Sequence, residues 1–228
     1  MFGLDDVIAS YSDGTSLVLV VLVAILLGLR HATDPDHVAA VTTLVASSRE
    51  RATRHAARLG VAWGLGHAAT LFLFGLPILF FGAYLPDRVQ QLAETAVALL
   101  IVALAVRLLL RWHAGGLTVQ SHLEAHGVRT AGSAFGIGLV HGMGGSAGVG
   151  ILIVASVEST ALAVLALGLL ALFTAVSMTM LTTGFGRALV SRPVSAALGH
   201  IAPMLGVASF AFGLWYGAAA WSVAPYPF

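Results

Sequence analysis

Residues 30–37 read Arg-His-Ala-Thr-Asp-Pro-Asp-His, and they interrupt an apolar stretch that extends over residues 16–46. Each Asp or Arg near the middle of a bilayer costs about 2.5–3.5 kcal/mol on insertion scales, so partners, water or an ion must offset the charge. Pro35 removes one helix N–H and disfavours helical geometry at Asp34. The pattern predicts a broken membrane helix whose freed backbone groups line a cavity or bind something.

The composition places this broken helix in a membrane protein. The chain is 58% hydrophobic and only 9% charged, with a mean hydropathy of +0.95, whereas soluble domains carry about 25% charged residues. We therefore predict an all-α membrane protein, with a single transmembrane domain over residues 1–228. The chain has no cysteine, which excludes disulfides and thiolate metal sites. Residues 1–13 are acidic, so we expect no removable signal peptide.

About 20 apolar residues are needed to cross the hydrocarbon core. The hydropathy pattern predicts six transmembrane helices, or seven if the first segment is two short spans. The predicted spans are 16–46, 59–85, 91–110, 131–157, 161–184 and 194–223.

Arginine sets the expected orientation, because cytoplasmic loops are enriched in positive charge. Arginines cluster in the first, third and fifth connections, whereas Arg88 alone lies on the opposite side. This bias predicts a protein of the cell (inner) membrane with both termini outside the cytoplasm. The arginines on the cytoplasmic side are Arg49, Arg51, Arg54, Arg58, Arg107, Arg111, Arg129, Arg187 and Arg192.

A short internal repeat relates two of the predicted spans. Gly-Leu-Arg-His at residues 28–31 recurs as Gly-Leu-Val-His at residues 138–141. Coincidence in a chain rich in Gly and Leu is the alternative. If the repeat is real, three spans per half give two halves of opposite orientation, as in many transporters that bind substrate near the midplane on broken helices.

Histidine and aspartate together suit a divalent transition metal. Within residues 30–37, His31, Asp34 and His37 are the predicted core ligands, with Asp36 as a ligand or as an acceptor for a histidine N–H. At 1.5 Å of helix rise per residue, His67 and His141 reach a depth similar to that of His37. This shared depth predicts one site near the midplane. The alternative is that each histidine is an ordinary satisfied polar residue of the helix bundle.

The sequence at residues 30–37 resembles the R-H-A-x-D-A-D-H signature of the nickel/cobalt transporter (NiCoT) superfamily, with Pro35 where the family usually has Ala. Leu-Gly-His at residues 65–67 matches a second motif of the family. The six predicted spans make the chain more similar to the short, urease-associated nickel permease-like branch. The resemblance implies transport of Ni²⁺ or Co²⁺, and it implicates His31, Asp34, Asp36, His37 and His67.

Other histidines have weaker patterns. His200 lies on the predicted last span as a candidate outer member of the pathway. A cytoplasmic capture site is an alternative to an ordinary solvated loop at His113, His122, Glu124 and His126.

Two other function classes remain open. Gly-Gly-Ser-Ala-Gly at residues 144–148 fits the pattern G-x-S-x-G. One alternative function is therefore a rhomboid-like intramembrane serine protease with Ser146 and His200 as its catalytic dyad. Packing of small residues between helices explains the glycines equally well. The other class is a membrane metal sensor that binds without translocating.

These patterns together predict a secondary transporter of a divalent transition metal, and not an enzyme. No G-x-x-x-x-G-K-[ST] motif for ATP binding is present. We expect no cofactor besides the transported ion, which is the substrate. The expected partners are that ion and the lipid bilayer, with no nucleic acid; a homo-oligomer or a partner subunit is left open.

Overall fold

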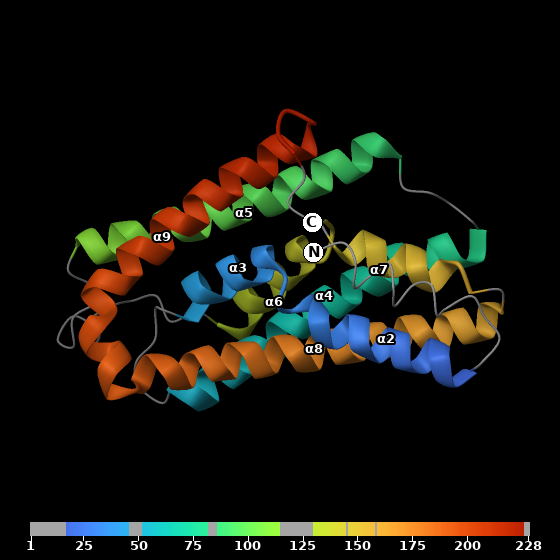
Figure 1. Ribbon diagram of the computed structural model, residues 1–228, viewed down its shortest axis with the longest axis horizontal. Helices are drawn as coiled ribbons and strands as arrows, with labels where there is room; N and C mark the ends of the chain where they lie inside the picture. The colour runs from blue at the N-terminus through green and yellow to red at the C-terminus, as the bar shows by residue number, and fades with distance from the viewer. Residues whose placement is uncertain are drawn as a thin grey trace.

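The computed structural model describes residues 17–45, 52–81, 86–114, 130–144, 146–157 and 159–225, and within them all regular structure is helical. Figure 1 shows an elongated bundle whose helices lie mostly along its long axis. The helices are α2 (Leu17–His31), α3 (Pro35–Val45), α4 (Ala52–Phe81), α5 (Asp87–His113), α6 (Ala131–His141), α7 (Ser146–Ala155), α8 (Thr160–Val190) and α9 (Arg192–Ala220).

The helices pack in two groups with short helices between them. In Figure 1, α5 and α9 lie side by side along one edge, and α2, α4 and α8 lie on the opposite side. Helix α2 packs along α8, and α6 packs along α4. The short helices α3 and α6 lie between the two groups (Figure 1). Both groups therefore border the centre of the molecule.

The first predicted span is broken, as expected. Helices α2 and α3 are separated by a break of three residues, 32–34, and bend by 46°. In Figure 1 they extend into opposite halves of the molecule from a break near the middle of its long axis. The break therefore brings residues 30–37 to the middle of the bundle.

The predicted fourth span, residues 131–157, is also two helices rather than one. Helix α6 ends at His141 and α7 begins at Ser146, each 11 residues or shorter. The physical reason is the sequence Gly-Met-Gly-Gly at residues 142–145, because glycine disfavours the helix interior.

Four helices are long and apolar enough to cross a membrane, and α2 with α3 makes a fifth span if the bent pair is counted as one. Since α6 and α7 are each short, the described residues contain up to five such spans rather than the six predicted. The surface supports a membrane location, because side chains such as Leu73, Phe81 and Met180 are 67%, 82% and 67% exposed. We conclude that this is a multi-pass helical membrane protein.

Two glycines allow α4 and α6 to cross in direct backbone contact. A Cβ atom on Gly138 would collide with the carbonyl oxygen of Trp63, and one on Gly66 would collide with that of Phe135. The Thr70 hydroxyl then donates to the Leu139 carbonyl at 2.9 Å. This contact fixes His67, next to Gly66, close to the end of α6.

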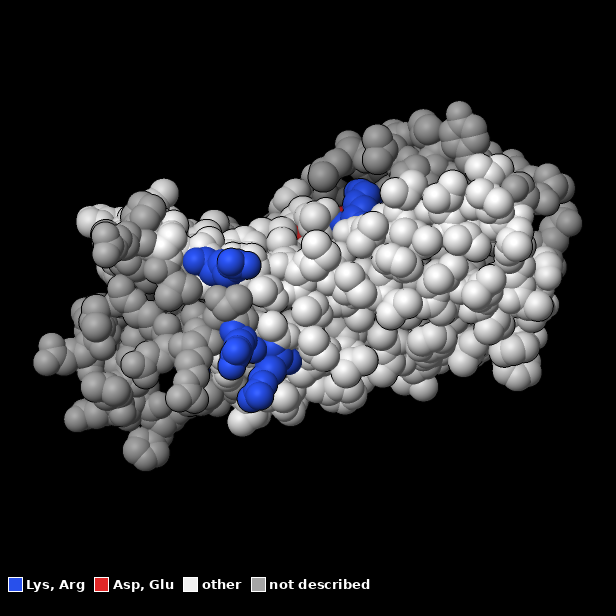
Figure 2. Space-filling model, turned by 90° about the horizontal axis from the view of Figure 1, so that it is seen from below, with Lys and Arg blue, Asp and Glu red and all other residues white. Residues whose placement is uncertain are grey.

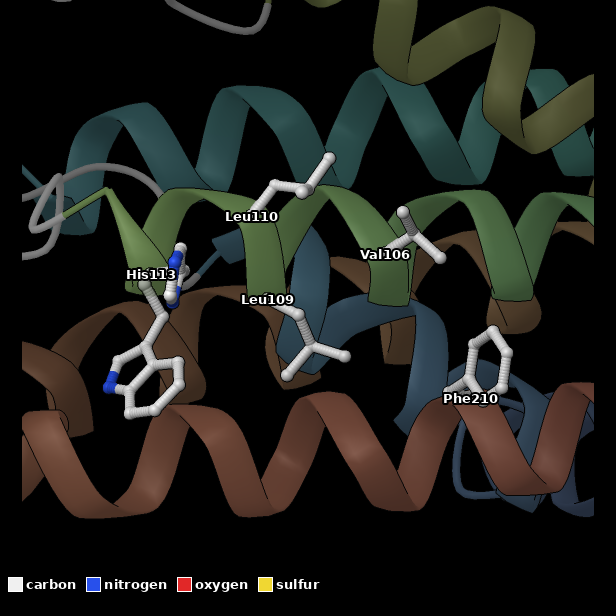
Figure 3. Close-up of a pocket in the computed structure, with 6 residues that line it drawn as sticks. Val106, Leu109, Leu110, His113 and Phe210 are labelled. Carbon is white, nitrogen blue, oxygen red and sulfur yellow. The ribbon is translucent and has the colours of Figure 1, made fainter.

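An apolar groove of about 340 Å³ lies between α5 and α9. Figure 3 shows its lining side chains projecting from these two helices. The groove is separate from the histidines at the two helix breaks, and it suits lipid chains better than ions. Its lining residues are Val106, Leu109, Leu110, Trp112, His113 and Phe210.

Candidate metal centre

A tight turn links α2 to α3. The backbone N–H of Thr33 donates to the Arg30 carbonyl at 2.8 Å, and that of Asp34 donates to the His31 carbonyl at 3.2 Å. Pro35 is the first residue of α3. A backbone N–H at this position would have no hydrogen-bond partner within the helix, so proline is tolerated there. The turn thus ends α2 at His31 and places Asp36 in the first turn of α3, where the helix dipole favours a negative charge.

Asp36 connects α3 to α6. Its Oδ1 lies 2.9 Å from the backbone N of His37 and 3.0 Å from the ring Nδ1 of His37. Its Oδ2 lies 3.2 Å from Nε2 of His141. One carboxylate therefore accepts from two imidazoles, and each ring keeps a second nitrogen.

His31 connects α2 to α4. Its Nε2 lies 2.9 Å from Nε2 of His67, so one of the two rings donates and the other accepts. On its other side, Nδ1 lies 3.5 Å from Oδ2 of Asp34. Arg30 pairs with the other oxygen of Asp34, Oδ1, at 3.7 Å.

The other three imidazoles of the cluster gather around His37. The centroid of its ring lies 4.6 Å from that of His31, 5.2 Å from that of His67 and 4.3 Å from that of His141. All four rings, together with Asp34 and Asp36, are buried. The structure thus brings together all six predicted ligands, with Asp34 at the edge beside Arg30.

Three ring nitrogens in this cluster are buried without a hydrogen-bond partner among the described residues: Nε2 of His37, Nδ1 of His67 and Nδ1 of His141. A buried polar atom left unpaired costs free energy, so such atoms call for an explanation. When one imidazole nitrogen carries the proton that bonds to Asp36, the other offers a lone pair. Unpaired nitrogens of this kind are suited to bind a cation.

Trp63 is a member of the centre that the sequence analysis missed. Its ring is fully buried and lies 5.7 Å from that of His37 and 5.8 Å from that of His141. The available signal was its position four residues before His67, because residues at this spacing share a helix face. Trp63 therefore borders the cluster on the side of His37 and His141.

The remaining histidines lie elsewhere. His200 on α9 and His113 at the end of α5 are both exposed. The structure does not describe the loop that contains His122, Glu124 and His126, nor the side chain of Ser146. Within the described residues, the structure therefore brings neither His200 nor His113 to the centre.

Comparisons with known proteins decide the family. The chain matches the sequence model of a family described as High-affinity nickel-transport protein over residues 17–119. It is also 30% identical, over 155 residues, to the urease accessory protein UreH of Bacillus sp. (strain TB-90), which covers 64% of this chain and 67% of that protein. The chain belongs to this nickel-transport family.

Membership in the nickel-transport family confirms the resemblance that residues 30–37 and 65–67 carry. The family consists of transporters rather than enzymes, so the protease alternative is not favoured. The matched segment contains His31, Asp36, His37 and His67, whereas His141 lies beyond it. No solved structure matches this nickel-transport chain.

Proposed function

We propose that this protein is a secondary transporter that moves Ni²⁺ or Co²⁺ across the cell membrane through the buried centre at the α2/α3 break. The observation that carries the proposal is the cluster of four imidazoles and a carboxylate, contributed by α2, α3, α4 and α6. Imidazole is a suitable ligand for nickel, as it is for several other transition metals, and a carboxylate offsets part of the charge of the ion. Ionisable residues within membrane spans typically mark ion pathways.

The packing supports an inverted repeat in which α2–α5 and α6–α9 are the two halves. Helix α2 packs along α8 of the other half, and α6 packs along α4 in the same reciprocal way. Each contact includes a hydrogen bond from a side-chain hydroxyl to a backbone carbonyl. Ser177 of α8 donates to the Gly28 carbonyl of α2 at 3.1 Å, and Thr70 of α4 donates to the Leu139 carbonyl of α6 at 2.9 Å. Reciprocal contacts of this kind suit two halves that rock about a shared central site.

The charge distribution supports the proposed orientation. Figure 2 shows that the basic side chains on this face gather toward one end of the long axis, with a further one near the middle. Arg54, Arg58 and Arg187 are exposed residues near helix ends that the sequence places on the cytoplasmic side. We propose that α6 and α7 together make a sixth, broken span, that this end faces the cytoplasm and that both termini lie outside.

Ni²⁺ uptake into proteoliposomes that hold a trapped fluorescent chelator tests the function. We expect saturable entry of Ni²⁺ or Co²⁺ by the unaltered chain, and loss of entry in the variant His37→Ala, because the ring at the middle of the cluster is removed. His200→Ala is the matched control, since His200 is exposed and lies outside the cluster; it should transport normally.

The same assay separates transport from sensing. A sensor would bind Ni²⁺ through the cluster without carrying it into the vesicles. Binding without flux in protein that is folded and inserted would therefore reject the transporter and favour the non-translocating alternative. Absence of both binding and flux would reject the nickel function altogether.

A further inference from the structure

His37 belongs to two different groups of potential metal ligands. The first consists of His31, His37 and His67, and the second of Asp36, His37 and His141. Within each group, one nitrogen or oxygen from each residue lies within 4.8 Å of the others. All members are buried, and His37 is the residue common to both groups.

The two groups share only His37, and among the described residues each is a separate set of neighbouring ligand atoms. Bonds from a metal to imidazole nitrogen are about 2.0–2.1 Å in zinc sites, so each group by itself is of a size that suits one ion. His67 and His141 belong to different groups, and their ring centroids are 6.3 Å apart, the widest separation among the ring contacts of the cluster. The geometry favours two neighbouring positions rather than one.

The two positions differ in charge and in hardness. The first offers three imidazoles and no carboxylate, whereas the second combines two imidazoles with the Asp36 carboxylate. Carboxylate oxygen is a harder ligand than imidazole nitrogen, and it adds a negative charge. A divalent ion would thus be held differently at each position.

The positions also join different parts of the fold. The first lies among α2, α3 and α4, all within the first half of the chain. The second joins α3 to α6, which belongs to the second half. A change in the packing of one half against the other would therefore alter the second group while leaving the first intact.

We propose that the transported cation occupies these two stations one at a time and passes between them by exchanging ligands around His37. We name them the imidazole station (His31, His37, His67) and the carboxylate station (Asp36, His37, His141). Asp36 holds Nδ1 of His37, so the unpaired Nε2 is the nitrogen that serves the imidazole station. This inference rests on the proposed function, because the ion at both stations is the transported one.

Three variants of the full chain in nanodiscs test the relay. His31→Ala removes only the imidazole station, His141→Ala only the carboxylate station, and His37→Ala both. Equilibrium binding of Ni²⁺ gives the affinity, and X-ray absorption of the bound ion counts its imidazole ligands.

We expect each single-station variant to bind one Ni²⁺ within about tenfold of the unaltered affinity. His37→Ala should weaken binding by about 100-fold or more, since even outer partners of metal ligands are worth 10–100-fold. The ion in His141→Ala should show an imidazole-only environment, and that in His31→Ala should show fewer imidazoles. Both variants should lose flux, because the ion can no longer be handed on.

A single composite site gives a different result. His31→Ala and His141→Ala would then each weaken binding as severely as His37→Ala, and this would overturn the relay even though the unaltered protein still carries Ni²⁺. If the unaltered protein neither binds nor carries Ni²⁺, the proposed function fails as well. His31→Gln and His141→Gln, with melting temperatures for all variants, distinguish loss of a ligand from loss of folding.

Discussion

Asp36 holds two of the four imidazoles of the centre. It accepts from the backbone and ring of His37 and lies 3.2 Å from the ring of His141. Asp34, at the edge of the cluster, contacts His31 and the partly exposed Arg30. A carboxylate that holds one imidazole nitrogen fixes the tautomer and raises the basicity of the other nitrogen. We therefore expect Asp36 to act both as a ligand of the proposed carboxylate station and as a positioning group for His37.

The substitution Asp36→Asn tests that role at nearly constant volume. The amide removes the negative charge and can accept from only one of the two rings through its single oxygen. We expect Ni²⁺ affinity to fall by about 10–100-fold, the usual effect of losing a carboxylate partner. Equilibrium binding measures it, with Gln90→Ala as a control on an exposed side chain of α5. Unchanged affinity would show that Asp36 is only structural.

Acid should weaken metal binding, because protons and metal ions compete for the same imidazole nitrogens. The unprotonated ring is the ligand, so binding should be strong at neutral pH and lost as the pH falls below about 6, near the ordinary histidine range. Titration of Ni²⁺ affinity between about pH 7.5 and pH 5.5 measures the effect. An affinity that does not change over this range contradicts it.

At the scale of elements, the two helix breaks are placed by different means. Pro35 and the turn at residues 32–34 define the first break, whereas glycine at positions 142, 144 and 145 marks the second. Each break ends a helix on a histidine, His31 in α2 and His141 in α6. The approach of α6 to α4 then depends on Gly66 and Gly138, at which a side chain would meet backbone.

Gly138→Ala should destabilise the α4–α6 crossing, because the new methyl group would collide with the Trp63 carbonyl oxygen. Overpacking of this kind costs about 1–3 kcal/mol. Gly136→Ala is the matched control on the same helix, since nothing lies within 4 Å of a Cβ atom there. Thermal unfolding in detergent should show a lower melting temperature for Gly138→Ala alone. Equal melting temperatures for the two variants would show that α4 and α6 do not cross at this contact.

At the scale of the whole molecule, the protein is an elongated bundle whose polar centre is enclosed by apolar helices. His37, His67 and His141 are at most 1% exposed, while large apolar side chains such as Leu110 are 65% exposed. This inversion of the soluble pattern is stable only where hydrocarbon surrounds the protein. The arginines at one end are the basis of the proposed orientation in the membrane.

The absence of cysteine allows a direct test of that orientation. Asp87→Cys and Ala114→Cys place single thiols at exposed positions at opposite ends of the helix α5. We expect a membrane-impermeant maleimide to label Asp87→Cys in intact cells, and Ala114→Cys only after permeabilisation. The reverse pattern would invert the proposed topology.

Much of the fold was predictable because hydropathy and proline act locally. The apolar stretches predict the long helices, and Pro35 with the charged residues around it predicts the first break. The interruption at residues 142–145 was missed as a break, because no charge or proline marks it within an otherwise apolar segment. The loop histidines at positions 122 and 126 lie outside the described residues, so their predicted role stays a prediction.

The sequence by itself determined that this is a helical membrane protein with a polar break at residues 30–37, and the motifs there and at residues 65–67 indicated nickel transport. Only the tertiary structure decided that Asp36 joins His37 to His141, that Trp63 covers the cluster and that His37 is common to two ligand groups. The physical reason is that these contacts depend on how α4 and α6 rotate and cross. That geometry is set by backbone contact at Gly66 and Gly138, which are 72 residues apart in the chain.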